Sequence, residues 1–191
     1  MGKVTASPNA MSPTDSRLKI YLLVLLFSCS LPLSSPALGW GIVNAKIRRE
    51  FPGVKRITTA ELAAWLNDKG RPVPLLLDVR TRAEFAVSHL PQAGQVEPDA
   101  PASVLQEVRD RAIVTYCSVG YRSGAFAARL QAAGFTNVLN LEGSIFQWAN
   151  EGRPIYRGAT PAKLVHPYNG LWGMLLEKKR RANVPSVEAE R

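Results

Sequence analysis

Short apolar runs alternate with amphipathic segments through the middle of the chain. The runs, rich in apolar and β-branched residues, are too short for helices and are typical of strands buried in a parallel sheet. The segments between them repeat apolar positions every three to four residues, as helices with one buried face do. Strands are expected at residues 54–57, 75–79, 113–116 and 137–141, and helices at 60–69, 82–86, 102–111, 123–133 and 145–151. This alternation predicts a three-layer α/β domain with a mainly parallel sheet flanked by helices.

A different pattern occupies the amino terminus. Basic residues precede an apolar run at 20–27, and the small-residue pattern Ser35-Pro36-Ala37 follows it. This order is typical of a secretory signal cleaved after Ala37, although residues 20–33 could instead remain as a membrane anchor or form a buried helix. Residues 1–37 are therefore interpreted as a signal peptide or anchor, and 38–53 as a linker. Because basic flanks stay inside, the domain is expected to be exported to a periplasm or lumen, or anchored with its folded part outside the cytoplasm.

Charge and cysteine content exclude several classes of protein. The chain of 191 residues carries 24 Lys and Arg against 15 Asp and Glu, a net charge of +9. Residues 54–157 are nearly balanced, with 12 basic and 10 acidic side chains, so no nucleic-acid partner is expected. Two cysteines, Cys29 and Cys117, are too few for a disulfide scaffold, and with two histidines they make a metal site unexpected.

The loop after the third predicted strand is the strongest candidate for chemistry. Cys117 ends that strand, Gly120 permits a tight turn, and a helix follows. Free amides of such a loop and the start of its helix stabilise an anion, which lowers the pKa of a thiol and makes it a nucleophile. The alternative is a buried cysteine with a structural role.

Four segments, in order along residues 54–157, resemble the signatures of single-domain rhodaneses, a family of sulfurtransferases. The active-site loop is matched by Cys117-x-x-Gly120-x-Arg122-Ser123, and the closing motif by Gly143 to Trp148 with Gly152 and Pro154. The two remaining signatures are Leu77-Asp78-Val79-Arg80 with Glu84-Phe85, and His89-Leu90-Pro91. Three positions that are glycine in the family pattern hold Ser88, Gln92 and Ser144.

The resemblance implies a rhodanese-like fold with a five-stranded sheet over residues 54–157, and a sulfurtransferase reaction that needs no cofactor. Cys117 would take a sulfane sulfur from a donor such as thiosulfate or a persulfide, hold it as a persulfide, and pass it to a thiol or cyanide. Arg122 would attract an anionic donor, while the loop amides hold the thiolate and the persulfide. The expected substrate-binding residues are Ser118, Val119, Gly120, Tyr121 and Arg122.

Other residues of the signatures are given structural roles. Asp78 and Arg80 are expected to support the site as a pair, and Glu84 to be solvated or to cap a helix. His89 is expected to be hydrogen-bonded in the fold, and Trp148 to lie in the core.

The loop length separates two kinds of chemistry. Phosphatases that share this fold use Cys-x5-Arg, whereas Cys117 and Arg122 are spaced as Cys-x4-Arg. The shorter loop favours a sulfur atom over a phosphoryl group. The competing function is a non-catalytic rhodanese-like sulfur carrier or interaction module.

Residues 158–191 form a basic carboxyl-terminal extension. Its apolar stretch and the basic run that follows could lie on a membrane surface or bind a partner. The alternative is that Leu171, Trp172 and Leu175 pack on the domain. Residues 184–191 are expected to be disordered.

Overall fold

A computed structural model of the protein describes residues 1–2 and 36–184, with the side chains of residues 1–2 and 39–184. Most of the predicted leader 1–37, including the apolar stretch 20–33, lies outside the described residues, and the leader stays a prediction. Within the described part of the chain, no helix combines the length and apolar character needed to span a bilayer.

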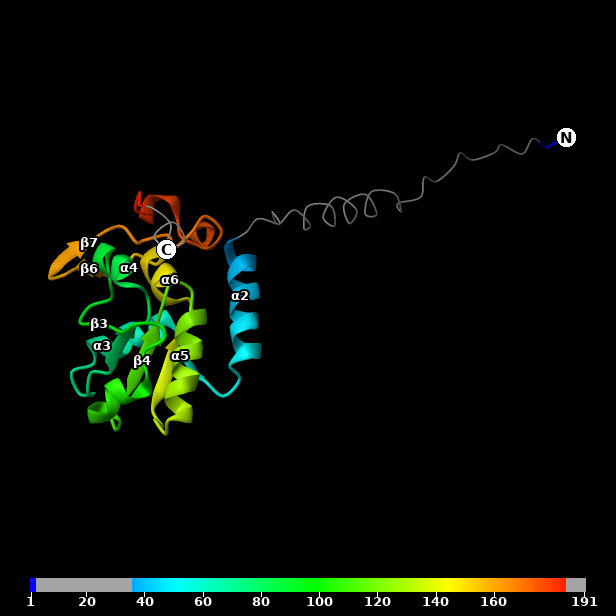
Figure 1. The fold of residues 1–191 in the computed structure, drawn as a ribbon. Helices are drawn as coiled ribbons and strands as arrows, with labels where there is room; N and C mark the ends of the chain where they lie inside the picture. The colour runs from blue at the N-terminus through cyan, green and yellow to red at the C-terminus, as the bar shows by residue number, and fades with distance from the viewer. Residues whose placement is uncertain (3–35, 185–191) are drawn as a thin grey trace. The chain divides into compact units, whose positions relative to one another are not determined.

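A parallel sheet of five strands forms the centre of the folded unit (Figure 1). The strands are β1 (Lys55–Ile57), β2 (Leu75–Asp78), β3 (Gly94–Gln95), β4 (Ile113–Tyr116) and β5 (Val138–Leu141). Their order across the sheet is β1-β5-β4-β2-β3, and every neighbouring pair is parallel. The predicted fold class is therefore confirmed.

Helices cover both faces of this sheet and enclose two hydrophobic cores. Helices α3 (Thr59–Asn67) and α6 (Ser144–Asn150) share one core, and α5 (Tyr121–Ala132) packs in the other. The short helix α4 (Arg82–Val87) follows β2. Val114 of β4 lies in the first core and Ile113 in the second, because successive side chains of a strand point to opposite faces.

Two elements differ from the expectation. The two-residue strand β3 lies in a segment expected to be loop, since so short a strand leaves no periodic pattern. The segment 102–111, expected as an α-helix, forms the 3-10 helix η1 (Ala102–Val108), which buries no residue. Val104 of this segment is 58% exposed.

The segment 38–53, interpreted as a linker, is mostly helix α2 (Pro36–Glu50), and that interpretation is corrected. Trp40, Val43 and Ile47 recur at helical spacing, and the first two pack against the core that contains α3 and α6. Ile47 is buried. Figure 1 shows α2 beside α5.

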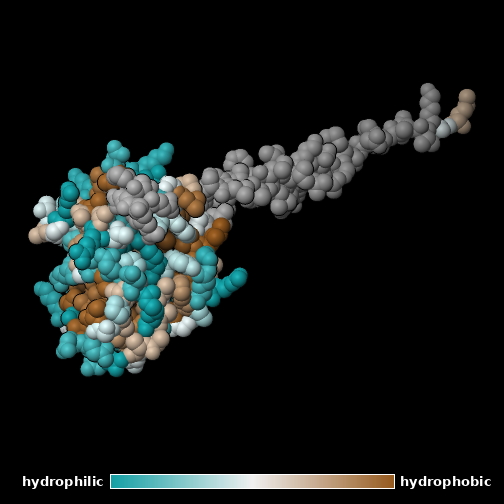
Figure 2. All heavy atoms as spheres, viewed as in Figure 1, coloured by the Kyte–Doolittle hydropathy of each residue, from teal (hydrophilic) through white to brown (hydrophobic). Residues whose placement is uncertain are grey.

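The carboxyl-terminal extension also folds onto the domain. Strand β7 (Thr160–Ala162) of the extension forms an antiparallel hairpin with β6 (Ile155–Arg157), which immediately precedes the extension, and the 3-10 helices η2 (Trp172–Leu175) and η3 (Lys178–Arg180) follow. Trp172 and Leu175 pack against the core as expected, but Leu171 is 65% exposed. Val165 and Leu176 are the buried anchors of this segment. At the top of the folded unit, where Figure 1 places the extension, Figure 2 shows hydrophobic and hydrophilic residues side by side.

Candidate active site

Cys117 follows β4 directly and is almost fully buried at the start of a turn into α5. Gly120 closes this turn with φ of 106°, a left-handed conformation that side chains disfavour. The turn places the Gly120 amide 3.1 Å from Cys117 Sγ, to which it donates a hydrogen bond. The loop therefore aims a main-chain donor at the sulfur, as the sequence predicted.

Strand β5 and helix α6 hold the loop from behind. The Cys117 amide donates to Ser144 Oγ at 3.2 Å. The Asn140 side chain donates to the Gly120 carbonyl at 2.9 Å and accepts from the Ser123 hydroxyl at 2.7 Å. All five residues are buried, so these bonds fix the loop before any ligand arrives. Sequence reasoning missed Asn140 and the role of Ser123 because they depend on contacts across the sheet.

At two of the three positions where the family pattern has glycine, the backbone keeps the left-handed conformation that glycine favours. Ser144 has φ of 50° and Gln92 has φ of 58°, both in the left-handed region. Ser88 is extended, a conformation that any residue adopts. Serine at position 144 adds a contact that glycine could not make, since its hydroxyl accepts a hydrogen bond from the Cys117 amide.

Arg122 lines the same pocket as Cys117, but its guanidinium is already paired with a carboxylate. Its guanidinium makes two hydrogen bonds of 2.8 Å to the Glu84 carboxylate and one of 3.0 Å to Ser118 Oγ. Ser118 Oγ in turn donates to Glu84 at 2.9 Å. Glu84 was expected to be solvated or to cap a helix: it caps α4 through Thr81, and its side chain is fully buried and not solvated.

These contacts set the charge states of the site. Burial opposes ionisation of Glu84, but hydrogen bonds and charge from Arg122, with help from Arg80, lower its pKa to about 2. Burial likewise opposes ionisation of Cys117. The charge of Arg122 and hydrogen bonds from Ser123 and Gly120 outweigh burial and lower the thiol pKa below its ordinary value. The geometry thus favours a thiolate nucleophile.

Asp78 and Arg80 form a fully buried ion pair at the end of β2. Arg80 Nε and Nη2 donate to the two Asp78 oxygens at 2.8 and 2.7 Å. Arg80 Nη2 also donates to the Ser88 carbonyl at 2.6 Å, and the Gln95 side chain donates to the Arg80 carbonyl at 2.9 Å. The pair expected from the sequence is therefore present, and it ties β2 to the segments that follow it.

His89 and Trp148 have the structural positions expected of them. His89 Nδ1 lies 2.9 Å from the Leu90 carbonyl, and its ring stacks on Phe85 with centroids 4.3 Å apart. Trp148 is buried, and its Nε1 donates to the Pro154 carbonyl at 2.8 Å.

A small pocket of about 100 Å³ opens in front of the sulfur. Four of the five residues expected to bind substrate line it, while Gly120 contributes its amide from behind. Two aromatic residues of the carboxyl-terminal extension complete the wall, and sequence reasoning did not assign them to the site. The lining residues are Cys117, Ser118, Val119, Tyr121, Arg122, Tyr168 and Trp172.

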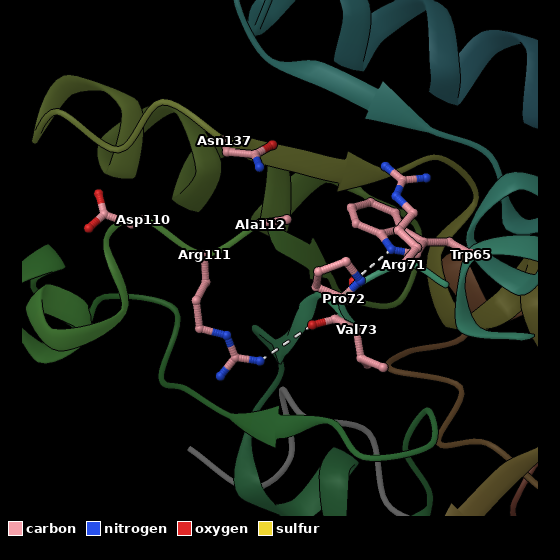
Figure 3. A pocket seen from close by; sticks show the side chains of 8 residues that line it. All are labelled: Trp65, Arg71, Pro72, Val73, Asp110, Arg111, Ala112 and Asn137. Carbon is pink, nitrogen blue, oxygen red and sulfur yellow. Dashed lines mark hydrogen bonds between the residues drawn. The ribbon is translucent and has the colours of Figure 1, made fainter. Parts of the chain in front are cut away.

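A separate pocket of about 380 Å³ lies at the other end of the sheet (Figure 3). Val73, Ala112 and Asn137, which line it, immediately precede or lie just before β2, β4 and β5. In parallel sheets chemistry is placed beyond the carboxyl ends of strands, whereas this pocket is at their amino ends. In this pocket Arg71 lies over the Trp65 ring, with Cζ 3.4 Å from the ring centroid (Figure 3). The smaller pocket, at the carboxyl end of β4, is therefore the candidate active site.

Among residues 1–2 and 36–184, no group of three or more His, Cys, Asp or Glu side chains is placed to hold an ion.

Comparisons with known proteins agree with this geometry. The family described as the Rhodanese-like domain matches residues 58–151. A protein named sulfurtransferase from Allochromatium vinosum is 42% identical over 82 residues, which are 42% of this chain and 77% of that protein. A tRNA uridine(34) hydroxylase of Cupriavidus taiwanensis is 33% identical over 124 residues, 59% of this chain but 44% of that protein.

A solved structure shows the same fold. The BH2092 protein of Bacillus halodurans superposes with a TM-score of 0.50 and 24% identity, covering 62% of this chain and 88% of that one. This likeness concerns the fold alone. The sequence matches, the five-stranded parallel sheet and the cysteine loop together place the chain in the rhodanese family.

Proposed function

We propose that the protein is a sulfurtransferase that carries a sulfane sulfur on Cys117. The observation that carries the proposal is the thiol itself, which accepts the Gly120 amide at 3.1 Å, has a lowered pKa and faces a small pocket. A structural cysteine needs neither a main-chain donor nor an open space in front of it. Relatives named sulfurtransferase give independent support.

The reaction is a double displacement at sulfur. The Cys117 thiolate attacks the outer sulfur of the donor, and the donor's S–S bond breaks as the new S–S bond forms. The rest of the donor leaves, as sulfite when the donor is thiosulfate and as a thiolate when it is a persulfide. A thiol or cyanide then attacks the outer sulfur of the Cys117 persulfide and regenerates the thiolate.

The main-chain donors suit both states of the cysteine. The charge moves outward by one atom when the persulfide forms, and the main-chain donors directed at the sulfur are those of Gly120 and Ser123. Because these groups are held by Asn140 and Ser144, they need no reorganisation during transfer.

Mass spectrometry of the intact chain tests the proposal. The full protein is incubated with thiosulfate or with an organic persulfide, and its mass is measured before and after addition of cyanide. We expect a gain of one sulfur atom that cyanide removes, and no gain in Cys117→Ser. Loss of the gain in the variant excludes Cys29 as the carrier.

Two outcomes would overturn the proposal. If neither donor adds sulfur to the wild-type protein, the domain is a non-catalytic module. If Cys117→Ser gains sulfur as the wild type does, the carrier is not Cys117. The mass of the mature chain also tests our proposal that the domain is exported, because removal of a leader shortens the chain.

A further inference from the structure

The carboxyl-terminal extension contributes two aromatic side chains to the pocket of Cys117. Tyr168 and Trp172 line that pocket, and both lie beyond the residues 58–151 that match the family. We call this pair the aromatic wall. No feature of the cysteine loop requires it, so the wall is a candidate for selecting the substrate.

Hydrogen bonds fix the backbone of this wall. The Tyr168 amide donates to His166 Nδ1 at 3.0 Å, and Tyr168 adopts φ of 66°, a conformation that non-glycine residues hold at a cost. The Trp172 amide donates to Asn169 Oδ1 at 3.0 Å. The surrounding structure therefore holds both aromatic residues in defined positions.

Two elements of the domain brace the segment that carries Trp172. The Asn150 side chain of α6 donates to the Leu175 carbonyl at 2.8 Å and accepts the Glu177 amide at 2.9 Å. Helix α2 approaches so closely at Gly39 that an added Cβ would lie 2.9 Å from the Leu175 side chain. The wall is thus pre-organised and does not have to order itself around a substrate.

The charge of the pocket is largely satisfied before a substrate enters. Arg122 is the one residue with a formally charged side chain among the described residues that line it, apart from the thiolate. Its Nη1 and Nη2 each donate to Glu84 at 2.8 Å, and the centroid of the Tyr168 ring lies 4.6 Å from its Cζ. A dianion such as thiosulfate would lose hydration here without meeting an available cation.

We propose that the aromatic wall selects an organic persulfide, R–S–SH, whose apolar R group contacts Tyr168 and Trp172, in preference to thiosulfate. This inference rests on the proposed function and names its donor class. Val119 and Tyr121 add further apolar surface to the same pocket. An R group of this kind gains contact with the rings where a sulfonate would gain none.

The step balances without an added oxidant or reductant. The Cys117 thiolate attacks the outer sulfur of R–S–SH, the S–S bond of the donor breaks, and its electron pair leaves on R–S⁻. The product is Cys117–S–SH, whose proton stays on the outer sulfur or passes to water. One S–S bond is exchanged for another.

Single-turnover loading of the full chain tests the selection. The wild-type protein is mixed with benzyl persulfide or with thiosulfate, quenched at intervals, and the rate of sulfur gain at Cys117 is read by mass spectrometry. Trp172→Ala removes half of the wall. Leu171→Ala, in the same segment but exposed and outside the pocket, is the matched control.

We expect Trp172→Ala to slow loading from benzyl persulfide by about tenfold, since an aromatic contact of about 1.4 kcal/mol corresponds to that factor. Loading from thiosulfate should stay within about twofold, because the dianion does not use the wall. Leu171→Ala should match the wild type with both donors.

A second variant removes any dependence on folding effects. Trp172→Lys keeps an apolar stem but places a cation at the pocket. It should speed loading from thiosulfate by about tenfold, the effect expected for one charge near a dianion in water. A damaged fold cannot produce this gain.

The outcomes separate the two proposals. If benzyl persulfide and thiosulfate both load the wild type and Trp172→Ala changes the two rates equally or not at all, the selection is overturned while sulfur transfer stands. If Trp172→Lys gives no gain with thiosulfate, the charge argument is overturned. If neither donor loads Cys117, the proposed function itself fails, and this inference with it.

Discussion

Replacing Glu84 by Gln measures how strongly the site depends on its buried ion pair. Glu84 is fully buried and holds Arg122 through two bonds of 2.8 Å, while Arg122 is 23% exposed. The pKa of Glu84 falls from the ordinary 4.5 to about 2, which corresponds to about 3 kcal/mol of stability at neutral pH. Glu84→Gln removes the negative charge but keeps the shape, so we expect a loss of about this size.

The pH dependence makes the test specific. Because the folded-state pKa is depressed, the contribution of Glu84 is complete above its unfolded value and is lost as pH falls toward about 2. About 2 of the 3 kcal/mol should be gone by pH 3, where Glu84 is almost fully protonated in the unfolded chain but still mostly ionised in the folded protein.

Urea unfolding of both proteins at neutral pH and at about pH 3 supplies the free energies. Glu97→Gln is the control, since its pair with Arg82 is exposed at both ends and should contribute less than about 1 kcal/mol. The reasoning is refuted if Glu84→Gln costs less than about 1 kcal/mol, or if its cost is the same at both pH values.

Three further substitutions probe the loop and its support. Gly120→Ala should destabilise the protein by about 1–3 kcal/mol in urea unfolding, because its φ of 106° strains any side chain; an unchanged midpoint would contradict the assigned turn. Asn140→Ala should cost about 2 kcal/mol and slow alkylation of the thiol, since the Gly120 carbonyl and the Ser123 hydroxyl lose their partner; normal alkylation would show that the loop holds itself. Arg80→Met should cost about 3–5 kcal/mol by leaving Asp78 buried without its cation, and thermal unfolding at the wild-type temperature would argue against the pair.

The local chemistry of the cysteine loop could be predicted because it is encoded by neighbours in the chain. Cys117, Gly120 and the start of α5 follow one another directly, so strand, turn and helix constrain where the amides point. The alternation of strands and helices likewise gave the sheet, since each element is long enough to show its period. Strand β3 escaped because two residues carry no period.

Contacts between distant segments could not be predicted from the sequence. Glu84 and Arg122 are separated by 38 positions, and nothing in their local pattern shows that one neutralises the other. Tyr168 and Trp172 reach the pocket through the path of the extension, which depends on packing against α6 and α2. The helix within 38–53, in contrast, had a readable signal in the spacing of Trp40, Val43 and Ile47.

Direct titration of the Cys117 thiol tests the basis of the proposed chemistry. Thiolate absorbance is followed against pH in the wild type and in Cys117→Ser, and the difference is assigned to Cys117. We expect a midpoint below the ordinary value for a thiol, because Arg122, Ser123 and Gly120 together outweigh the effect of burial. A midpoint at or above that value would show that burial prevails, and Cys117 would then be a core residue and no carrier of sulfur.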